Sequence, residues 1–128
     1  MKPAMWKATL AAIAVLSLVR VASTHRIFSQ IIDEPPHIGA GFQWLSGRTV
    51  FDVDHPPLER VLSALPLKLS SVTEPAETDW IRYGNQLLGS GRDYAHNLAL
   101  ARLGNLLLFG IGLVSIGLWA RRVVPDGG

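Results

Sequence analysis

An uninterrupted apolar run near the carboxyl end constrains this chain more than any other feature. Residues 103–120 include no ionisable side chain over 18 positions. At a rise of about 1.5 Å per residue, a helix of that length covers ~27 Å, close to the hydrocarbon thickness of a bilayer. Only 17% of the residues are charged, below the roughly 25% usual in soluble domains. The run therefore predicts a transmembrane helix, which we place at residues 94–120.

This predicted span contains four glycines, at positions 104, 110, 112 and 117. Glycine weakens a water-exposed helix, but in a membrane it lets a second helix approach closely. We therefore expect neighbouring spans.

A second apolar stretch, residues 8–19, lies near the amino end and is open to two interpretations. It has the length of a signal-peptide core, and residues 21–23 offer a small-residue cleavage site. Against cleavage, Arg20 lies between the core and that site. Apolar residues also continue at helical spacing beyond it, at positions 21, 27, 28, 31 and 32. We favour a retained transmembrane helix with an extension, residues 8–32, in which Arg20 reaches the interface.

The charges predict the orientation of the two spans. Lys2 and Lys7 precede the first, and Arg121 and Arg122 follow the second. Residues 24–97 carry a net charge of −3, whereas the rest of the chain carries +5. By the positive-inside rule both termini are cytoplasmic and the intervening loop is periplasmic or extracellular.

The predicted fold class is thus an all-α membrane protein of the plasma (inner) membrane. Residues 1–7 form a cytoplasmic N-terminus, residues 33–93 an extracytoplasmic loop and residues 121–128 a cytoplasmic tail. The net charge of +2 gives no reason to expect a nucleic-acid partner, and with no cysteine the chain has neither a disulfide nor a Cys-based zinc site.

The loop is predicted to form short amphipathic helices lying on the bilayer surface. The first, 35–46, begins with two prolines; the second follows Asp54 as its cap and has an apolar stripe at 58, 61, 62 and 65; the third covers 77–88. Asp93 can cap the long helix that enters the membrane.

Two adjacent carboxylates, Asp33 and Glu34, fall where the first span should leave the membrane. A carboxylate here could act as a general base toward an acceptor hydroxyl or amine. The pair could instead only cap the helix that begins at Pro35.

Four other side chains are candidate ligand-binding groups. His37 and His55 could hold a phosphate or, with the carboxylates, a divalent metal ion, although their spacing matches no metal-binding motif. Arg102, early in the second span, could pair with a carboxylate, bind a phosphate or extend to the interface. Arg60 could contact a phosphate or be a solvated surface charge.

Several of these residues belong to motifs of one family. The chain resembles the N-terminal region of bacterial polyprenyl-phosphate-dependent glycosyltransferases with the GT-C membrane fold, a group that includes protein O-mannosyltransferases and the aminoarabinose transferases of lipid A. The resemblance rests on six stretches in order, residues 33–41, 42–45, 55–58, 65–67, 100–103 and 119–122.

This resemblance implies roles for individual residues. In the family, the aspartate of the Asp-Glu pair is taken as the base that activates the acceptor, which implicates Asp33, with Glu34 supporting the site or a metal ion. The His-Pro-Pro-Leu element corresponds to residues 55–58, and Arg60 stands where the family usually has lysine.

Family members carry many more membrane helices than two. We therefore expect a truncated or split transferase, inactive alone, that assembles with membrane lipid, a polyprenyl-phosphate-linked sugar and the remainder of the enzyme as a separate chain. The alternative is a non-enzymatic two-span membrane protein whose loop binds a partner or a membrane complex. A third possibility is a secreted domain that begins near Thr24 after signal cleavage.

Overall fold

The structure is a computed structural model that describes residues 3–48, 54–70, 72–91 and 93–123. All regular secondary structure in these ranges is helical: α1 (Pro3–Thr24), α2 (Glu34–Leu45), α3 (Pro57–Lys68), α4 (Trp80–Gly89) and α5 (Tyr94–Val123). This confirms the all-helical fold class. The predicted termini 1–7 and 121–128 lie partly outside the described residues.

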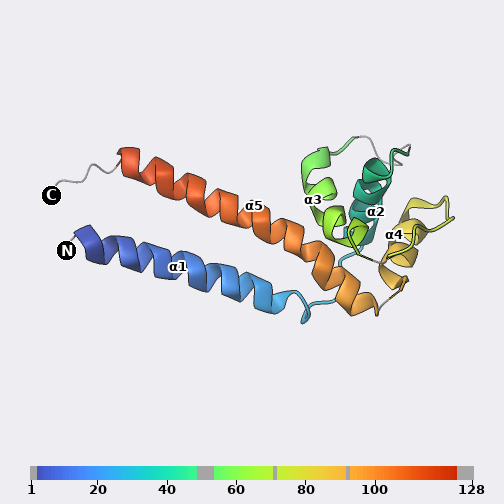
Figure 1. The fold of residues 1–128 in the computed structure, drawn as a ribbon, viewed down its shortest axis with the longest axis horizontal. Coiled ribbons are helices and arrows are strands. Elements are labelled where there is room, and N and C mark those ends of the chain that lie inside the picture. The colour runs from blue at the N-terminus through green and yellow to red at the C-terminus, as the bar shows by residue number, and fades with distance from the viewer. Residues whose placement is uncertain (1–2, 49–53, 71, 92, 124–128) are drawn as a thin grey trace.

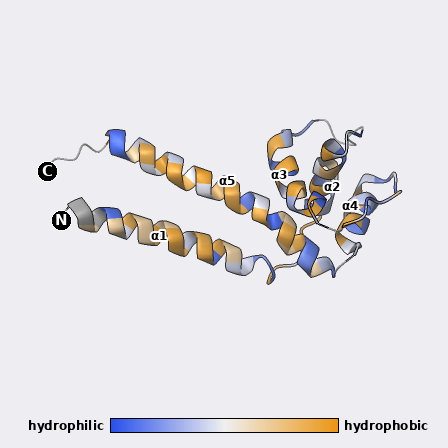
Figure 2. Ribbon diagram, viewed as in Figure 1, coloured by the Kyte–Doolittle hydropathy of each residue, from blue (hydrophilic) through white to orange (hydrophobic). Residues whose placement is uncertain are grey.

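The two long helices form an antiparallel hairpin. α1 and α5 run in opposite directions, so the start of α1 and the end of α5 lie at the same end of the hairpin (Figure 1). None of the described α1 side chains is buried, and α5 buries no residue beyond Gly104. Apolar residues recur along both helices (Figure 2). Both are long and apolar enough to cross a membrane, as a two-span membrane protein requires.

The first long helix ends at Thr24, eight residues before the predicted limit of residue 32. Beyond Thr24 the chain turns tightly, because the Ile27 amide bonds the Thr24 carbonyl at 3.0 Å. The carbonyls of His25 and Phe28 accept hydrogen bonds from a side chain of α5, which compete with those of a continuing helix. Apolar periodicity alone did not reveal this competing partner. α5 begins at the predicted residue 94 and ends three residues later than expected.

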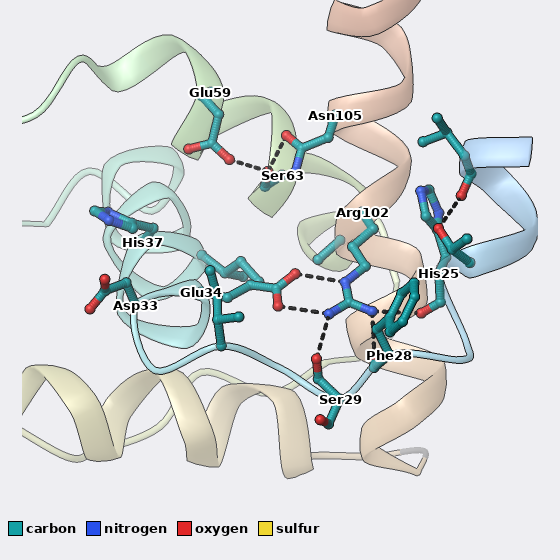
Figure 3. A pocket seen from close by; sticks show the side chains of 15 residues that line it. His25, Phe28, Ser29, Asp33, Glu34, His37, Glu59, Ser63, Arg102 and Asn105 are labelled. Atoms are coloured by element: carbon teal, nitrogen blue, oxygen red, sulfur yellow. Dashed lines mark hydrogen bonds and ion pairs between the residues drawn. The ribbon is translucent and has the colours of Figure 1, made fainter. Parts of the chain in front are cut away.

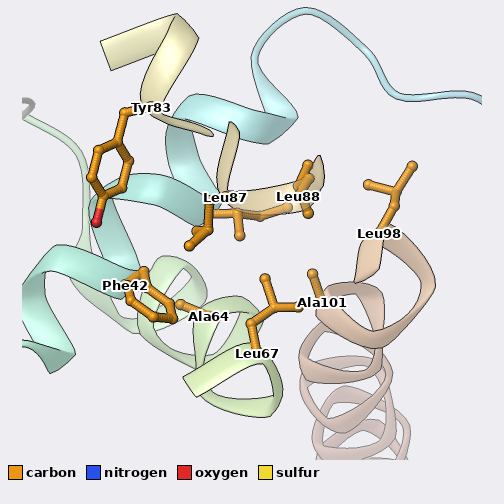
Figure 4. Packing of buried hydrophobic residues seen from close by; sticks show 9 residues of the cluster. Phe42, Ala64, Leu67, Tyr83, Leu87, Leu88, Leu98 and Ala101 are labelled. Atoms are coloured by element: carbon orange, nitrogen blue, oxygen red, sulfur yellow. The ribbon is translucent and has the colours of Figure 1, made fainter. Parts of the chain in front are cut away.

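The three short helices pack together at one end of the hairpin, around the first turns of α5 (Figure 1). Their core contains nine buried side chains, drawn in Figure 4: Ile38, Phe42, Ala64, Leu67, Tyr83, Leu87, Leu88, Leu98 and Ala101. We call α2, α3, α4 and the first turns of α5 the bundle. The loop helices therefore bury side chains against one another, and their predicted position on the bilayer surface stays a prediction.

Glycine permits each of three close helix contacts in the bundle. A Cβ on Gly41 of α2 would overlap the Arg60 carbonyl of α3, and a Cβ on Gly84 of α4 would overlap the Pro35 carbonyl. Gly104 of α5 lies in the same way against the Leu62 carbonyl. The neighbour of Gly104 is thus a loop helix. A Cβ added at Gly110, Gly112 or Gly117 would instead meet no atom within 4 Å outside its own helical turns.

The helix starts agree with the sequence in part. Asp93 caps α5 as predicted, accepting a hydrogen bond from the His96 amide at 2.6 Å. α4 begins three residues later than the expected Glu77, because Asp79 is its cap. The prediction for Asp54 is wrong, since the N-cap of α3 is Pro56 and makes no side-chain cap bond.

The apolar stripe predicted for α3, at positions 58, 61, 62 and 65, is not buried in the bundle. Leu58 is 62% exposed and Leu65 38% exposed. The buried residues of α3 are Arg60, Ser63, Ala64 and Leu67. Serine and alanine are small enough to let α3 lie close to both α2 and α5. At these contacts the backbone of α3 packs against Gly41 of α2 and Gly104 of α5. The fit between backbones outweighs the burial of leucine at this contact.

Candidate functional site

A cleft of about 620 Å³ lies where the end of α1, the following turn, α2, α3 and α5 meet (Figure 3). Part of its wall is apolar, formed by Val21, Phe28, Ile31 and Ile38. Polar side chains line the rest of it: Thr24, His25, Ser29, Asp33, Glu34, His37, Glu59, Ser63, Arg102 and Asn105. The cleft is therefore amphipathic, with charged groups beside an apolar surface.

An ion pair between α2 and α5 lies in this cleft. Arg102 Nε donates to Glu34 Oε1 at 2.7 Å, and Arg102 Nη2 donates to Glu34 Oε2 at 2.8 Å. Two parallel bonds of this kind fix both position and orientation. Both side chains are largely shielded from solvent. Of the alternatives open for Arg102, pairing with a carboxylate is the arrangement in the structure.

Arg102 also binds the backbone of the turn that follows α1. Its Nη1 donates to the carbonyls of His25 and Phe28, each at 2.8 Å, and Nη2 donates to Ser29 at 3.3 Å. Arginine has five N–H groups, so the whole donor set is used within the chain. Arg102 thus joins the end of α1 to α2 and α5, and its predicted contact with substrate stays a prediction.

Asp33 occupies the N-cap position of α2, but its side chain makes no cap hydrogen bond. Asp33 is exposed at the edge of the cleft, and in Figure 3 its carboxylate points away from the Glu34–Arg102 pair. The two adjacent carboxylates therefore differ in role: Glu34 is held by arginine, whereas Asp33 faces outward. Capping does not account for the Asp33 carboxylate.

Three other predicted residues meet at the side of the cleft. Arg60 Nε donates to His37 Nδ1 at 3.0 Å, and the rings of His37 and His55 lie 5.1 Å apart, edge to face. Since His37 Nδ1 accepts this bond, Nε2 carries the N–H of the neutral ring. Arg60 is only 3% exposed. It is a buried group and not a solvated surface charge.

The structure thus gathers all six predicted site residues in one region. Asp33, Glu34, His37 and Arg102 line the cleft, while His55 and Arg60 join it through His37. Their predicted catalytic and substrate-binding roles stay predictions.

Glu59, Ser63 and Asn105 are among the polar residues of the cleft that were not predicted. The Ser63 hydroxyl lies 3.1 Å from Glu59 Oε1 and 3.3 Å from Asn105 Oδ1, so it joins α3 to α5. A sequence signal existed for each: Asn105 falls one helical turn after Arg102, and Glu59 and Ser63 are four residues apart.

His25 lies in the turn beside the Arg102 guanidinium and was also not predicted. Burial and the positive charge of Arg102 hold the pKa of His25 below its usual value of 6.5, against an opposing effect of Glu34. His25 is therefore mainly neutral near pH 7, and its carbonyl accepts from Arg102.

The described residues offer no side-chain cluster for the divalent metal ion that the sequence left open. Among them, no group of three or more His, Asp or Glu side chains is placed to hold one. Glu34, the carboxylate suggested as a support for metal, is bonded to Arg102.

Comparisons of the chain with protein-family models, curated proteins and solved structures give no match. The resemblance to glycosyltransferases therefore rests on the ordered motifs alone, and function has to be argued from the geometry of the cleft.

Proposed function

We propose that the chain is the N-terminal part of a membrane glycosyltransferase that transfers a sugar from a polyprenyl-phosphate donor to an extracytoplasmic acceptor. In this proposal α1 and α5 span the inner membrane with both ends in the cytoplasm, and the bundle lies on the outer side. The observation that carries the proposal is the Asp33 carboxylate, exposed at the edge of an amphipathic cleft and not used as a helix cap.

The proposed chemistry is displacement at the anomeric carbon of the sugar. Asp33 accepts the proton of the acceptor hydroxyl or amine as the acceptor forms its bond to that carbon. The bond from the carbon to the phosphate oxygen breaks, and the polyprenyl phosphate leaves with the electron pair. Glu34 is a positioning residue in this scheme, because its bonds to Arg102 fix the start of α2 and hence the place of Asp33.

The lining of the cleft supports a donor that is part lipid. Apolar side chains such as Phe28 and Ile31 and polar side chains such as Glu34 and Ser63 line the same cleft. A lipid-linked sugar phosphate has the same division between chain and headgroup.

The test is Asp33→Asn in membranes that hold this chain together with the further spans that the proposal requires. With labelled polyprenyl-phosphate sugars from the same membranes, transfer should fall at least ~100-fold, the lower range for loss of a general base. Asp93→Asn is the matched control, because asparagine caps a helix as well as aspartate does. Full transfer by the Asp33 variant, at equal amounts of folded protein, would sink the assignment.

One observation favours the non-enzymatic alternative, a two-span protein whose bundle binds a partner. All five N–H groups of Arg102 are used internally, and Arg60 is buried, which suits structural arginines. The DNA downstream distinguishes the two. A continuation that encodes further hydrophobic spans favours the transferase, and its absence favours the stand-alone protein.

A further inference from the structure

A second cavity lies between α1 and α5, on the side of these helices away from the cleft. It has a volume of about 320 Å³ and is lined by residues of both helices and of the turn after α1, among them Ala22, Ser23, Arg26, His96, Leu100 and Leu103. The cleft is lined instead by Ala101, Arg102 and Asn105 of α5. Since successive residues on a helix point about 100° apart, the two sets lie on opposite faces of α5. We call the second cavity the α1–α5 groove.

The two sides of the α1–α5 groove carry side chains in the same order. On α5 a histidine at position 96 is followed by leucines at positions 100, 103 and 107, whose spacings of four, three and four keep them on one face. On the other side an arginine at position 26 is followed, toward the start of α1, by alanine at 22 and valines at 19 and 15. Val19 is 59% exposed and Leu107 54% exposed. The groove is thus polar at its outer end, and its continuation along both helices is apolar.

The charge at the outer end of the groove is positive. Residues 24–97 carry a net charge of −3, yet the lining of the groove includes Arg26 and no carboxylate. Arg26 is exposed, and within the described ranges its side chain makes no hydrogen bond or ion pair. A guanidinium group can give two parallel N–H bonds to a phosphate. The groove therefore favours an anionic group at Arg26.

The depth of Arg26 indicates which phosphate this is. The apolar window of α1 ends at Thr24, and the uncharged run of α5 begins directly after Arg102, which bonds the His25 carbonyl. The end of α1 lies beside the first turns of α5 (Figure 1). In the hairpin of the proposed function, Arg26 and His96 thus lie just outside the hydrocarbon, at the depth of lipid phosphates.

We infer that the α1–α5 groove is a binding site for an anionic phospholipid of the outer leaflet. Arg26 donates to the lipid phosphate, and the ring N–H of His96 donates to the headgroup. An acyl chain lies along the apolar faces that contain Val19 and Leu103. The bound lipid holds the end of α1 against α5 from the side opposite the Glu34–Arg102 pair. This inference rests on the hairpin of the proposed function and not on its chemistry.

Fluorescence quenching by brominated lipids can test this, because the chain contains no cysteine that would take up a label. The full chain with Val19→Cys is labelled with a thiol-reactive fluorophore and placed in vesicles of phosphatidylcholine and phosphatidylglycerol. One of the two lipids at a time is brominated at the middle of its acyl chains. Val19 lies seven residues before Arg26, and so ~10 Å deeper along the helix, near the level of the bromines.

Phe109→Cys gives the control label. Phe109 follows Asn105 by four residues, so it lies on the cleft side of α5, and it is 37% exposed. It comes seven residues after Arg102, which places it at a depth similar to that of Val19.

We expect brominated phosphatidylglycerol to quench the Val19 label about fivefold more effectively than brominated phosphatidylcholine, as one cation beside an anionic headgroup allows. The Phe109 label should show no such preference. Arg26→Gln should remove the preference at Val19. Arg82→Gln is the matched control, because it removes the same charge from an exposed position on α4 and should leave the preference intact.

Three results would overturn the inference and leave the hairpin standing. The first is equal quenching of the Val19 label by both lipids. The second is an equal preference for phosphatidylglycerol at Val19 and Phe109, which would show a general attraction of the chain for anionic lipid. The third is a Val19 label that neither lipid quenches while the Phe109 label is quenched, because protein would then cover the groove. If neither label is quenched, the helices do not enter lipid, and the hairpin and the inference both fail.

Inorganic phosphate distinguishes a lipid from a free anion as the ligand. Added phosphate should reduce the preference for phosphatidylglycerol no more than sodium chloride of the same ionic strength does, since both screen the charge of Arg26 equally. A larger loss with phosphate would assign the site to the free anion and overturn the inference.

Discussion

The bundle and the free lengths of the two long helices differ in where their apolar side chains point. In the bundle nine apolar side chains are buried against one another, and three glycines let the backbones approach closely. Along α1 and the last two thirds of α5 the described side chains are not buried, and large apolar residues are exposed. The bundle can hold its shape by its own contacts, whereas the described parts of α1 and the outer part of α5 leave large apolar side chains exposed, as helices that cross a membrane do.

The Glu34–Arg102 pair lies where these two regions meet. Through it α5, which belongs to both, is bonded to α2 and to the turn that ends α1. Damage within the bundle should therefore unfold the bundle alone, while damage to this pair should uncouple it from α1.

The largest effect should follow Gly41→Val. The added side chain would overlap the Arg60 backbone, so α2 and α3 would have to separate. Overpacking against backbone should lower the free energy of unfolding by about 3 kcal/mol or more. Thermal unfolding followed by circular dichroism would measure this loss.

Gly112→Val is the matched control, because a Cβ added at Gly112 would meet no other part of the described structure within 4 Å outside its own helical turns. The contrast between bundle and free helix predicts no loss of bundle stability in this variant. Equal losses in the two variants would contradict the packing described for α2 and α3.

Arg102→Ala should have the next largest effect. The substitution leaves Glu34 without its partner and removes the donors to the turn after α1. Since the pair is mostly shielded, we expect a loss of about 2 to 3 kcal/mol, somewhat below that of a fully buried pair. Hydrogen exchange of the amides of residues 25–34 would show it as faster opening of the turn.

Arg121→Ala is the corresponding control on the same helix, since Arg121 is exposed at its last turn. The exchange rates of residues 25–34 should be unchanged in this variant. A similar acceleration in both variants would mean that the arginine charge, and not the contact with Glu34, holds the turn.

The positions of the helices could be predicted from local sequence, whereas the contacts between the helices could not. Uncharged length predicted α5, and Asp93 marked its start correctly. The end of α1 depended on Arg102, which lies 77 residues from the His25 carbonyl that it bonds. The exposed face of α3 depended on glycines in two other helices. Periodicity identifies the apolar face of a helix, but only the partner backbones decide which face is buried.

The members of the candidate site could be predicted from the sequence, but which of them bond to one another could not. Charged and histidine residues near predicted interfaces marked all six members. Which of two adjacent carboxylates is engaged could not be predicted, because neighbours on a helix point about 100° apart and only the position of Arg102 selects Glu34. His25 went unnoticed because it lies in a turn that the sequence assigned to a longer helix.

The smallest effect should be a dependence on pH at the junction of the two regions. Because burial and Arg102 lower the pKa of His25 below 6.5, the unfolded chain takes up a proton more readily than the folded chain as the pH falls. Stability should therefore be full above pH 6.5 and decline below it. His25→Gln removes the titrating ring but keeps the backbone carbonyl that accepts from Arg102. Melting temperatures measured from pH 7.5 to 5.5, a range that brackets the usual histidine pKa, should fall less in this variant than in the wild type; equal slopes would show that the junction does not sense pH through His25.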